Sequence, residues 1–244
     1  MVSKSQIKLI TGLAQKKNRS KLGLFLAEGI KGINEILNSN FELDSLYTTS
    51  EIFNAPGSKI HLITEAELKK LSGLTTPQTA VAIFKIPEEK TLSLKGLILA
   101  LDGIRDPGNL GTIIRLCDWF GIETLLCSPD TVDCYNPKVV QATMGSITRV
   151  SILYRSLEEI IKEAGNLPVL GAFMEGENVY TSQLPAEGIL VMGNEANGIS
   201  GKIEKLVTKK VSIPPFGNTS NTESLNAATA TAILLSEFRR QQNY

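Results

Sequence analysis

The sequence is poor in the residues that build metal sites and disulfide frameworks. Among 244 residues it has one histidine, His61, and three cysteines, Cys117, Cys127 and Cys134, without a C-x-x-C pair. Structural zinc sites and disulfide frameworks need closely spaced groups of these residues. We therefore expect no metal ion and reduced thiols, as in a cytoplasmic protein.

Long apolar runs are also missing. No stretch approaches the roughly 20 apolar residues that a membrane span requires, and the basic start of the chain is not followed by the apolar region of a signal peptide. We expect a soluble, unexported protein with no membrane partner. Apolar residues still make up 42% of the chain and charged residues 20%, so a packed core is expected and disorder is not.

Neither sign of charge is in excess, because 25 basic residues balance 25 acidic ones. That balance argues against a basic field over the whole surface. The first 27 residues depart from it, since they contain basic residues and no acidic one. Two interpretations remain open: a solvated helix face, or an arm that contacts the phosphates of a nucleic acid. In the second, the RNA-binding side chains are those of Lys16, Lys17, Arg19 and Lys21.

Four familiar catalytic motifs are absent. Nothing in the chain fits G-x-G-x-x-G, G-x-x-x-x-G-K-[ST], G-x-S-x-G or H-E-x-x-H. Their absence disfavours a dinucleotide oxidoreductase, a phosphate-loop nucleotidase, a serine hydrolase and a zinc protease.

Residues 1–86 predict a small α/β domain. Apolar residues at helical spacing predict helices over 3–17 and 28–38, and Thr64 with Glu67 forms a capping box for a third helix. Strands are expected near Phe25 and at 46–49, 60–63 and 78–86. His61 lies on one of them between apolar residues, where we expect an ordinary, partly buried histidine. The polar segment that opens with Pro87 predicts a linker over 87–95.

From residue 96 to 244 strands and helices alternate. Strands are predicted at 96–101, 123–127, 150–153, 168–173, 188–192 and 210–213, and helices at 110–120, 137–144, 156–164 and 224–241. This pattern predicts an α/β fold with a mostly parallel sheet. Ligands of such sheets bind beyond the carboxyl ends of the strands. Three polar, glycine-marked clusters fall near such ends, at 102–115, 193–200 and 214–226.

Each cluster has an ordinary interpretation beside a functional one. Pro107 and Gly108 suit a turn, with Asn109 as the cap of the next helix. Arg115 either forms an ion pair with Asp118 on that helix or reaches a ligand, and spacing alone favours the ion pair. The second cluster, in which an apolar strand runs into Gly-Asn-Glu, is by itself a weak signal.

Taken in order, the three clusters resemble the three motifs of the SpoU family of RNA ribose 2′-O-methyltransferases, which belong to the SPOUT class. The first motif is matched by Asp106-Pro107-x-Asn109-x-Gly111 with Arg115, the second by Gly193-Asn194-Glu195-x-x-Gly198, and the third by Ile213-Pro214 with Ser224-Leu225-Asn226. The resemblance runs from residue 97 to the end. The first 85 residues are similar in size and position to the L30e-like RNA-binding domain that precedes the catalytic domain in many members.

The resemblance implies a fold in which the C-terminal segment threads a loop to form a deep trefoil knot, and a homodimer that packs near the site. It also implies S-adenosylmethionine as cofactor. By position, the cofactor-binding residues would be Ala172, Met192, Gly193, Asn194, Ile213, Pro214 and Leu225. The segment 214–223 is longer than in the shorter members of the family.

The family roles place Arg115 at the ribose 2′-hydroxyl, with Asn109, Glu195, Ser224 and Asn226 assisting. The methyl donor is an activated sulfonium, so the enzyme has to align the hydroxyl and remove its proton, and no metal is needed. Because an arginine keeps its proton at neutral pH, we hypothesise that Arg115 mainly positions the hydroxyl and a neighbouring RNA phosphate.

Three readings of the function follow. The first is methylation of a ribose 2′-hydroxyl in structured RNA, with ribosomal RNA favoured over tRNA because an N-terminal domain is present. The second is a non-catalytic RNA-binding or ribosome-assembly protein on the same scaffold, and the third is an unrelated α/β enzyme. The filled motif positions favour the first reading.

Overall fold

The computed structural model describes residues 2–217 and 224–243, and the chain divides into two compact units. The N-terminal unit combines Met1–Glu89 with Asp133–Arg149, and the C-terminal unit combines Lys90–Val132 with Val150–Tyr244. A segment from the middle of the chain, 133–149, thus packs with the first 89 residues, and we call this arrangement the exchange of segment 133–149. The predicted division at 86 and 96 did not include it.

The N-terminal unit is a four-stranded sheet with helices on both faces. Its sheet has the order β1-β4-β2-β3, with β2 and β3 parallel and the other pairs antiparallel. The strands are β1 (Leu24–Glu28), β2 (Leu43–Thr48), β3 (Ile60–Leu62) and β4 (Ala80–Lys85). The helices are α1 (Lys4–Gly12), α2 (Lys16–Leu22), α3 (Ile30–Leu37), α4 (Glu65–Leu71) and α6 (Pro137–Thr143), with 3-10 turns η1 (Gly57–Lys59) and η2 (Ser146–Thr148).

The predicted helix over 3–17 is two helices. A capping box between Ser3 and Gln6 starts α1, and the main chain turns at Leu13, whose N–H bonds to the carbonyl of Ile10 at 3.1 Å. Leu13 is fully buried. Its packing therefore sets the break between α1 and α2, which helical periodicity does not reveal.

His61 corrects a second expectation. We expected a partly buried side chain, but His61 is exposed and its ring stacks on Tyr47 with the ring centroids 4.8 Å apart. It lies on β3, the edge strand of the sheet, where one side of the strand has no neighbour.

Segment 133–149 completes the N-terminal unit. The ring of Tyr135 packs against Phe25 on β1 at 4.9 Å, and Asp133 forms an ion pair with Arg19 on α2. Gly145 lies so close to Glu35 on α3 that a Cβ atom there would be 2.4 Å from the glutamate Cβ. The segment therefore belongs to the core of this unit.

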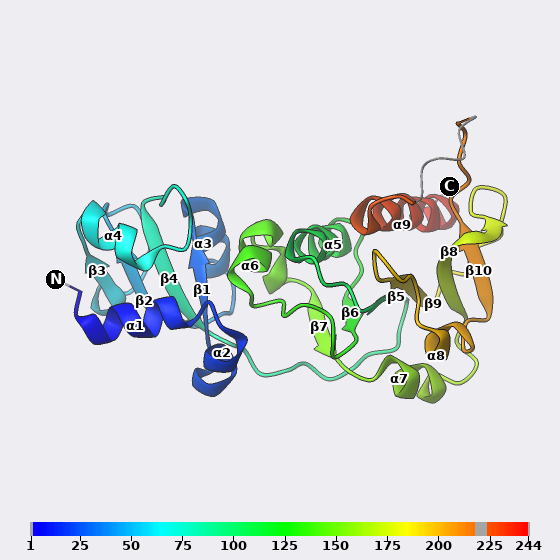
Figure 1. The fold of residues 1–244 in the computed structure, drawn as a ribbon, viewed down its shortest axis with the longest axis horizontal. Helices are drawn as coiled ribbons and strands as arrows, with labels where there is room; N and C mark the ends of the chain where they lie inside the picture. The colour runs from blue at the N-terminus through cyan, green and yellow to red at the C-terminus, as the bar shows by residue number, and fades with distance from the viewer. Residues whose placement is uncertain (1, 218–223, 244) are drawn as a thin grey trace. The chain divides into compact units, whose positions relative to one another are not determined.

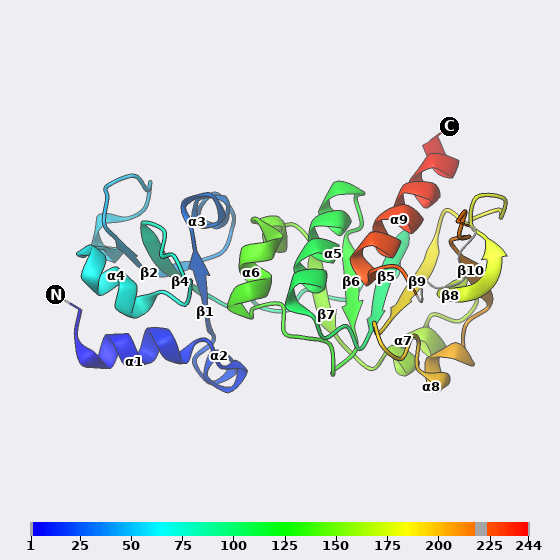
Figure 2. The ribbon, with the colours of Figure 1, turned by 45° about the horizontal axis from the view of Figure 1, so that its top comes forward.

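The C-terminal unit is a six-stranded parallel sheet in the order β10-β8-β9-β5-β6-β7. Helices α5 and α9 cover one face and α7 and α8 the other (Figures 1 and 2). The strands are β5 (Leu97–Asp102), β6 (Thr124–Cys127), β7 (Ser151–Tyr154), β8 (Val169–Asn178), β9 (Gly188–Gly193) and β10 (Lys209–Ser212). The helices are α5 (Pro107–Trp119), α7 (Leu157–Glu163), α8 (Gly201–Glu204) and α9 (Ala227–Asn243).

The order of the strands creates a switch point at the centre of the sheet. From β5 the chain continues outward to β6 and β7, then crosses to β8 and returns to β9 on the other side of β5. The loops after β5 and β9 therefore leave neighbouring strands in opposite directions, and Asp102 pairs with Gly193 at their ends. In parallel α/β sheets, such a point opens the crevice in which ligands bind.

Candidate functional site

Three side chains join the three sequence clusters at this crevice. Asn109 lies in the first turn of α5, Glu195 follows β9, and Asn226 directly precedes α9. The Asn109 amide donates to the Glu195 carboxylate at 2.8 Å, and the Asn226 amide donates to the Asn109 carbonyl oxygen, also at 2.8 Å. Glu195 and Asn226 are exposed and Asn109 is half-buried, so this chain of hydrogen bonds lies where a ligand can reach it.

The side-chain hydrogen bonds run from Asn226 as donor, through Asn109, to Glu195 as final acceptor. The Asn226 side-chain oxygen accepts from the main-chain N–H groups of Ala228 and Thr229, at 3.0 and 3.2 Å, and so caps α9. Asn226 therefore lies just before α9, not in its first turn as predicted. Because its oxygen is used by the helix, its NH₂ group faces Asn109, and the NH₂ group of Asn109 in turn faces Glu195.

The turn after β9 requires glycine. A Cβ atom on Gly193 would lie 2.2 Å from the carbonyl carbon of Gly198, far inside van der Waals contact. The two main-chain hydrogen bonds between Asn194 and Gly198, both 2.9 Å, close this turn, and Gly198 has φ +67°. The close approach of two backbones fixes where Glu195 leaves the strand.

Residues outside the motif positions brace these loops, and their roles were not predicted. The N–H of Gly103 donates to the Ser128 hydroxyl at 2.9 Å, and its carbonyl accepts from the Asn194 amide at 2.6 Å. The buried Asp102 carboxylate accepts from the N–H of Ser200 at 2.7 Å. In the sequence, the one signal for the role of Asp102 is its position as a charged residue at the end of an apolar strand.

Arg115 lies six residues after Asn109 on α5, about 9 Å along the helix axis. Its side chain is exposed and makes no hydrogen bond or ion pair with any residue that the structure describes. The ion pair with Asp118 that helical spacing favoured is thus not formed. Ser224 is exposed beside this site, and the residues just before it, 218–223, lie outside the described part of the chain.

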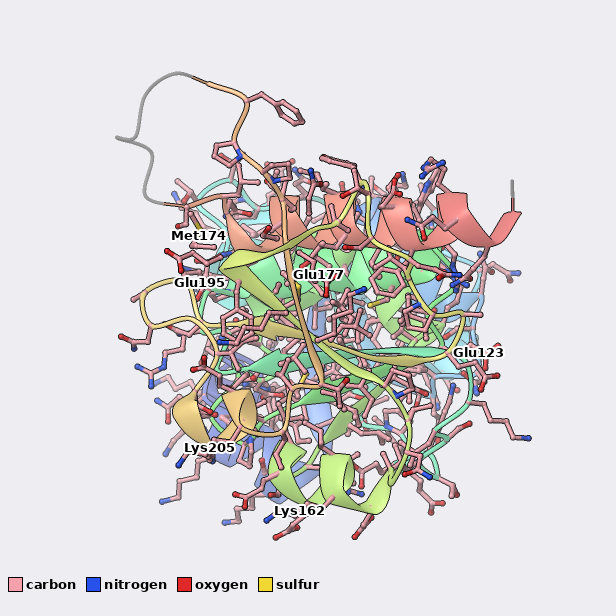
Figure 3. The ribbon with its side chains drawn as sticks, turned by 90° about the vertical axis from the view of Figure 1, so that its right-hand side faces the viewer. Glu123, Lys162, Met174, Glu177, Glu195 and Lys205 are labelled. Carbon is pink, nitrogen blue, oxygen red and sulfur yellow. The ribbon has the colours of Figure 1, made fainter. Side chains whose placement is uncertain are left out.

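Six of the seven predicted cofactor-binding residues lie on or just after three adjacent strands. Ala172 lies on β8, Met192 and Gly193 end β9, Asn194 follows them, and Ile213 and Pro214 follow β10. Leu225 precedes α9, and its main-chain N–H and C=O form no hydrogen bond among the described residues. Free main-chain groups beside half-buried apolar side chains fit the polar and apolar parts of a nucleoside cofactor. Figure 3 shows this unit from the side, with Glu195, which follows β9, on the left and Glu123, which precedes β6, on the right.

Of the four basic residues predicted to bind RNA, three are exposed and one is buried. Lys16, Lys17 and Lys21 are exposed on α2, whereas Arg19 is 2% exposed. Its guanidinium pairs with Asp133 and donates to the carbonyls of Leu13 and Ala14 at 2.8 and 3.0 Å. Arg19 therefore stabilises the fold, and we remove it from the predicted RNA-binding set.

In the described part of the chain, the single histidine and the three cysteines form neither a metal site nor a disulfide. No group of three or more His, Cys, Asp or Glu side chains there could hold a metal ion. All three cysteines are buried and form no disulfide bond, and burial raises the pKa of Cys117. Among the described residues, none of the helices could cross a membrane.

Residues 96–236 match the SpoU rRNA methylase family, and residues 4–82 match an MRM3-like substrate-binding domain. Among curated proteins, the chain is 29% identical over 235 residues to the 23S rRNA (guanosine(2553)-2′-O)-methyltransferase RlmP of Bacillus subtilis, covering 93% of each. It is 35% identical over 159 residues to the 23S rRNA (guanosine-2′-O-)-methyltransferase RlmB of Neisseria meningitidis, covering 63% of this chain and 62% of that protein.

Solved structures resemble the chain over its whole length. A protein from Porphyromonas gingivalis described as a TrmH-family RNA methyltransferase has a TM-score of 0.90 and 37% identity, covering 99% of each chain. An S-adenosylmethionine-bound rRNA methyltransferase from Sinorhizobium meliloti has a TM-score of 0.87 and 29% identity, covering 100% of this chain and 98% of that one. With the family match over residues 96–236 and the three motif loops joined at the switch point, the chain belongs to the SpoU rRNA methylase family.

Proposed function

We propose that this protein transfers a methyl group from S-adenosylmethionine to a ribose 2′-hydroxyl of ribosomal RNA. The observation that carries the proposal is the hydrogen-bonded chain of Asn109, Glu195 and Asn226. It joins all three motif loops beyond the carboxyl ends of the strands, at the position where parallel sheets bind ligands. A scaffold kept only for RNA binding has no need to hold these three polar side chains together.

The substrate class is inferred from the relatives. The two curated relatives described above act on guanosines of 23S rRNA by name, and one of them is similar over nearly the whole chain. The N-terminal unit, which matches a substrate-binding domain, presents Lys16, Lys17 and Lys21 on α2 for phosphate contacts. A tRNA substrate is the alternative for the same chemistry.

The cofactor is assigned to Ala172 on β8 and to the residues that end or follow β9 and β10. The main chain at Gly193 and Leu225 supplies hydrogen-bonding groups, while Ala172, Ile213 and Pro214 supply apolar contacts. S-adenosylmethionine, when bound, supplies a methyl group on a positively charged sulfur. The trefoil knot stays a prediction for this chain, as part of the same proposal.

Arg115 is assigned to positioning. Its free guanidinium can donate two parallel hydrogen bonds, to the ribose hydroxyl and to a phosphate of the same RNA strand. A guanidinium retains its proton at neutral pH, so the proton of the hydroxyl leaves through the neighbouring RNA phosphate or late in the transition state. Asn109, Glu195 and Asn226 fix the first turn of α5, and thereby the direction in which Arg115 extends.

A homodimer is the proposed assembly. On α5 the side chain of Trp119 is 84% exposed, which is unusual for a tryptophan on a helix that packs in an α/β layer. A second copy that covers this side chain would remove it from water. Sedimentation of the parent and of Trp119→Glu tests this assignment, because the variant should sediment as a monomer.

Isothermal titration with S-adenosylmethionine tests the proposed function. Leu225→Arg places a long charged side chain beside the proposed cofactor contacts, and Leu62→Arg makes the same change at an exposed leucine on β3. We expect saturable binding by the parent and by Leu62→Arg, and none by Leu225→Arg. If the parent binds no S-adenosylmethionine even with ribosomal RNA present, the non-catalytic reading replaces the proposal.

A further inference from the structure

Two exposed aromatic side chains lie close together at the end of the C-terminal unit that carries the proposed cofactor contacts. Phe216 is 84% exposed and Tyr180 is 41% exposed, and their ring centroids are 6.2 Å apart with an angle of 36° between the ring planes. Neither residue belongs to the three motifs. Large exposed aromatic side chains that gather in one place indicate a binding surface.

Each ring lies a few residues after a segment that contains a predicted cofactor-binding residue. Phe216 follows Ile213 by three residues, which limits the distance between their Cα atoms to about 11 Å. Tyr180 follows the strand that contains Ala172. A ligand that touches both rings is therefore within one or two nucleotides of the proposed methyl donor.

Tyr180 is held by its backbone, and the same hydrogen bonds tie it to the strand before Phe216. The N–H of Tyr180 donates to the Asn178 side-chain oxygen at 2.9 Å, and the N–H of Val179 donates to the carbonyl of Ser212 at 3.0 Å. The Ser212 hydroxyl donates to the carbonyl of Gly176 at 3.0 Å. The Tyr180 side of the aromatic pair is thus held in place before any ligand binds.

The negative charge of Glu177, three residues before Tyr180, is compensated by a lysine. Glu177 forms an ion pair with Lys209 at 3.0 Å and accepts from the Ser182 hydroxyl at 3.2 Å. The bond from Lys209 holds the pKa of Glu177 below its usual value, so the pair persists at neutral pH. An RNA backbone that passes the rings meets a paired carboxylate at this position.

We propose that Tyr180 and Phe216 form a stacking platform for an unpaired base next to the nucleotide that is methylated. This inference rests on the proposed function and adds a specificity contact to it. Proteins recognise unpaired RNA by stacking bases on aromatic rings, and each stacked base contributes about 1–3 kcal/mol, which is about 5- to 150-fold in affinity. A base held there leaves the neighbouring ribose near the proposed cofactor contacts.

The test compares RNA binding by variants that lack one of the two rings with RNA binding by variants that keep a ring at the same position. Binding of unmodified, in vitro transcribed large-subunit rRNA would be measured over a range of salt concentrations for the parent, Tyr180→Ala, Phe216→Ala and the ring-retaining Tyr180→Phe and Phe216→Tyr. We expect the alanine variants to bind the RNA about 5- to 150-fold more weakly and the ring-retaining variants to match the parent. The dependence of affinity on salt should stay unchanged, because no phosphate contact is lost.

Two controls separate the possible failures. S-adenosylmethionine binding by each variant, measured by titration, should equal that of the parent, which shows that the cofactor loops are intact. Alanine variants that bind the RNA as tightly as the parent would overturn the stacking platform while leaving the proposed function in place. A change from dimer to monomer on sedimentation, with RNA affinity unchanged, would assign the rings to contact with a second copy and overturn it as well.

Discussion

Arg115 and Arg19 show how differently two arginines of one sequence are used. Arg19 lies in the basic stretch that predicts a phosphate contact, yet it is buried against Asp133. Arg115 has a nearby carboxylate at helical spacing, yet it remains exposed and without a partner among the described residues. Sequence spacing could not distinguish them, because Asp133 is 114 residues from Arg19.

The positioning role of Arg115 predicts the behaviour of Arg115→Lys. Lysine keeps the positive charge but cannot donate two parallel hydrogen bonds from one planar group. We expect single-turnover methylation of ribosomal RNA to slow by about tenfold or more, consistent with the loss of one charge-assisted hydrogen bond. S-adenosylmethionine affinity should not change. Nearly full turnover in the variant would show that charge alone suffices.

The capping box of α4 predicts a contribution to stability that depends on pH. Hydrogen bonds from the N–H groups of Thr64 and Val2 lower the pKa of Glu67 from 4.5 to about 2. The ionised form is favoured in the folded state, so this stabilisation is complete above pH 4.5 and is lost as the pH falls toward 2.

Glu67→Gln provides the measurement. Urea unfolding midpoints of the parent and of the variant would be compared at pH 6 and pH 3. The parent should be the more stable at pH 6, and the difference should shrink at pH 3. A difference that is equal at both pH values would contradict the assignment of the low pKa to this cap.

At the scale of elements, the alternation of strands and helices in the C-terminal unit was predictable from short apolar runs between turn residues. Each predicted strand and helix is present, and most boundaries agree within three residues. The exception is β8, which runs on to Asn178. Helix α9 begins at Ala227, three residues after the predicted start, because Asn226 caps it. The four-residue helix α8 was not predicted, because one turn has no periodicity to detect.

The turn after β9 predicts opposite outcomes for two glycines. Gly193→Ala puts a Cβ atom 2.2 Å from the main chain of Gly198, whereas a Cβ on Gly201 in α8 meets nothing within 4 Å. We expect Gly193→Ala to lower the free energy of unfolding by at least about 1–3 kcal/mol and to abolish S-adenosylmethionine binding. Gly201→Ala should change stability by less than about 0.5 kcal/mol. Similar urea midpoints for both variants would contradict this reading of the turn.

At the scale of the whole molecule, the exchange of segment 133–149 could not be predicted. The linker over 87–95 suggested two domains that are continuous in sequence, and the family match to residues 96–236 includes the exchanged segment. The exchange depends on long-range contacts such as Tyr135 with Phe25 and Asp133 with Arg19. No periodicity or local motif encodes contacts between residues more than 100 positions apart.

The exchange predicts that Asp133→Asn destabilises the N-terminal unit. Arg19 is 2% exposed and its partner 14%, so loss of the carboxylate leaves a buried charge unpaired. We expect a loss of about 3–5 kcal/mol in the free energy of unfolding. Glu42→Gln, which breaks an exposed pair with Lys85, is the matched control and should stay close to the parent. Equal effects of the two substitutions would show that the buried pair does not stabilise the unit.

The central claim is methyl transfer to a ribose 2′-hydroxyl of ribosomal RNA, and the chemical form of the product tests it most directly. Unmodified ribosomal RNA would be incubated with methyl-labelled S-adenosylmethionine and the protein, then hydrolysed in alkali. A 2′-O-methyl group blocks cleavage at its own position, so we predict label in alkali-resistant dinucleotides for the parent and none for Arg115→Ala. Label confined to single nucleotides would place the methyl group elsewhere, and no label with the parent would contradict the claim.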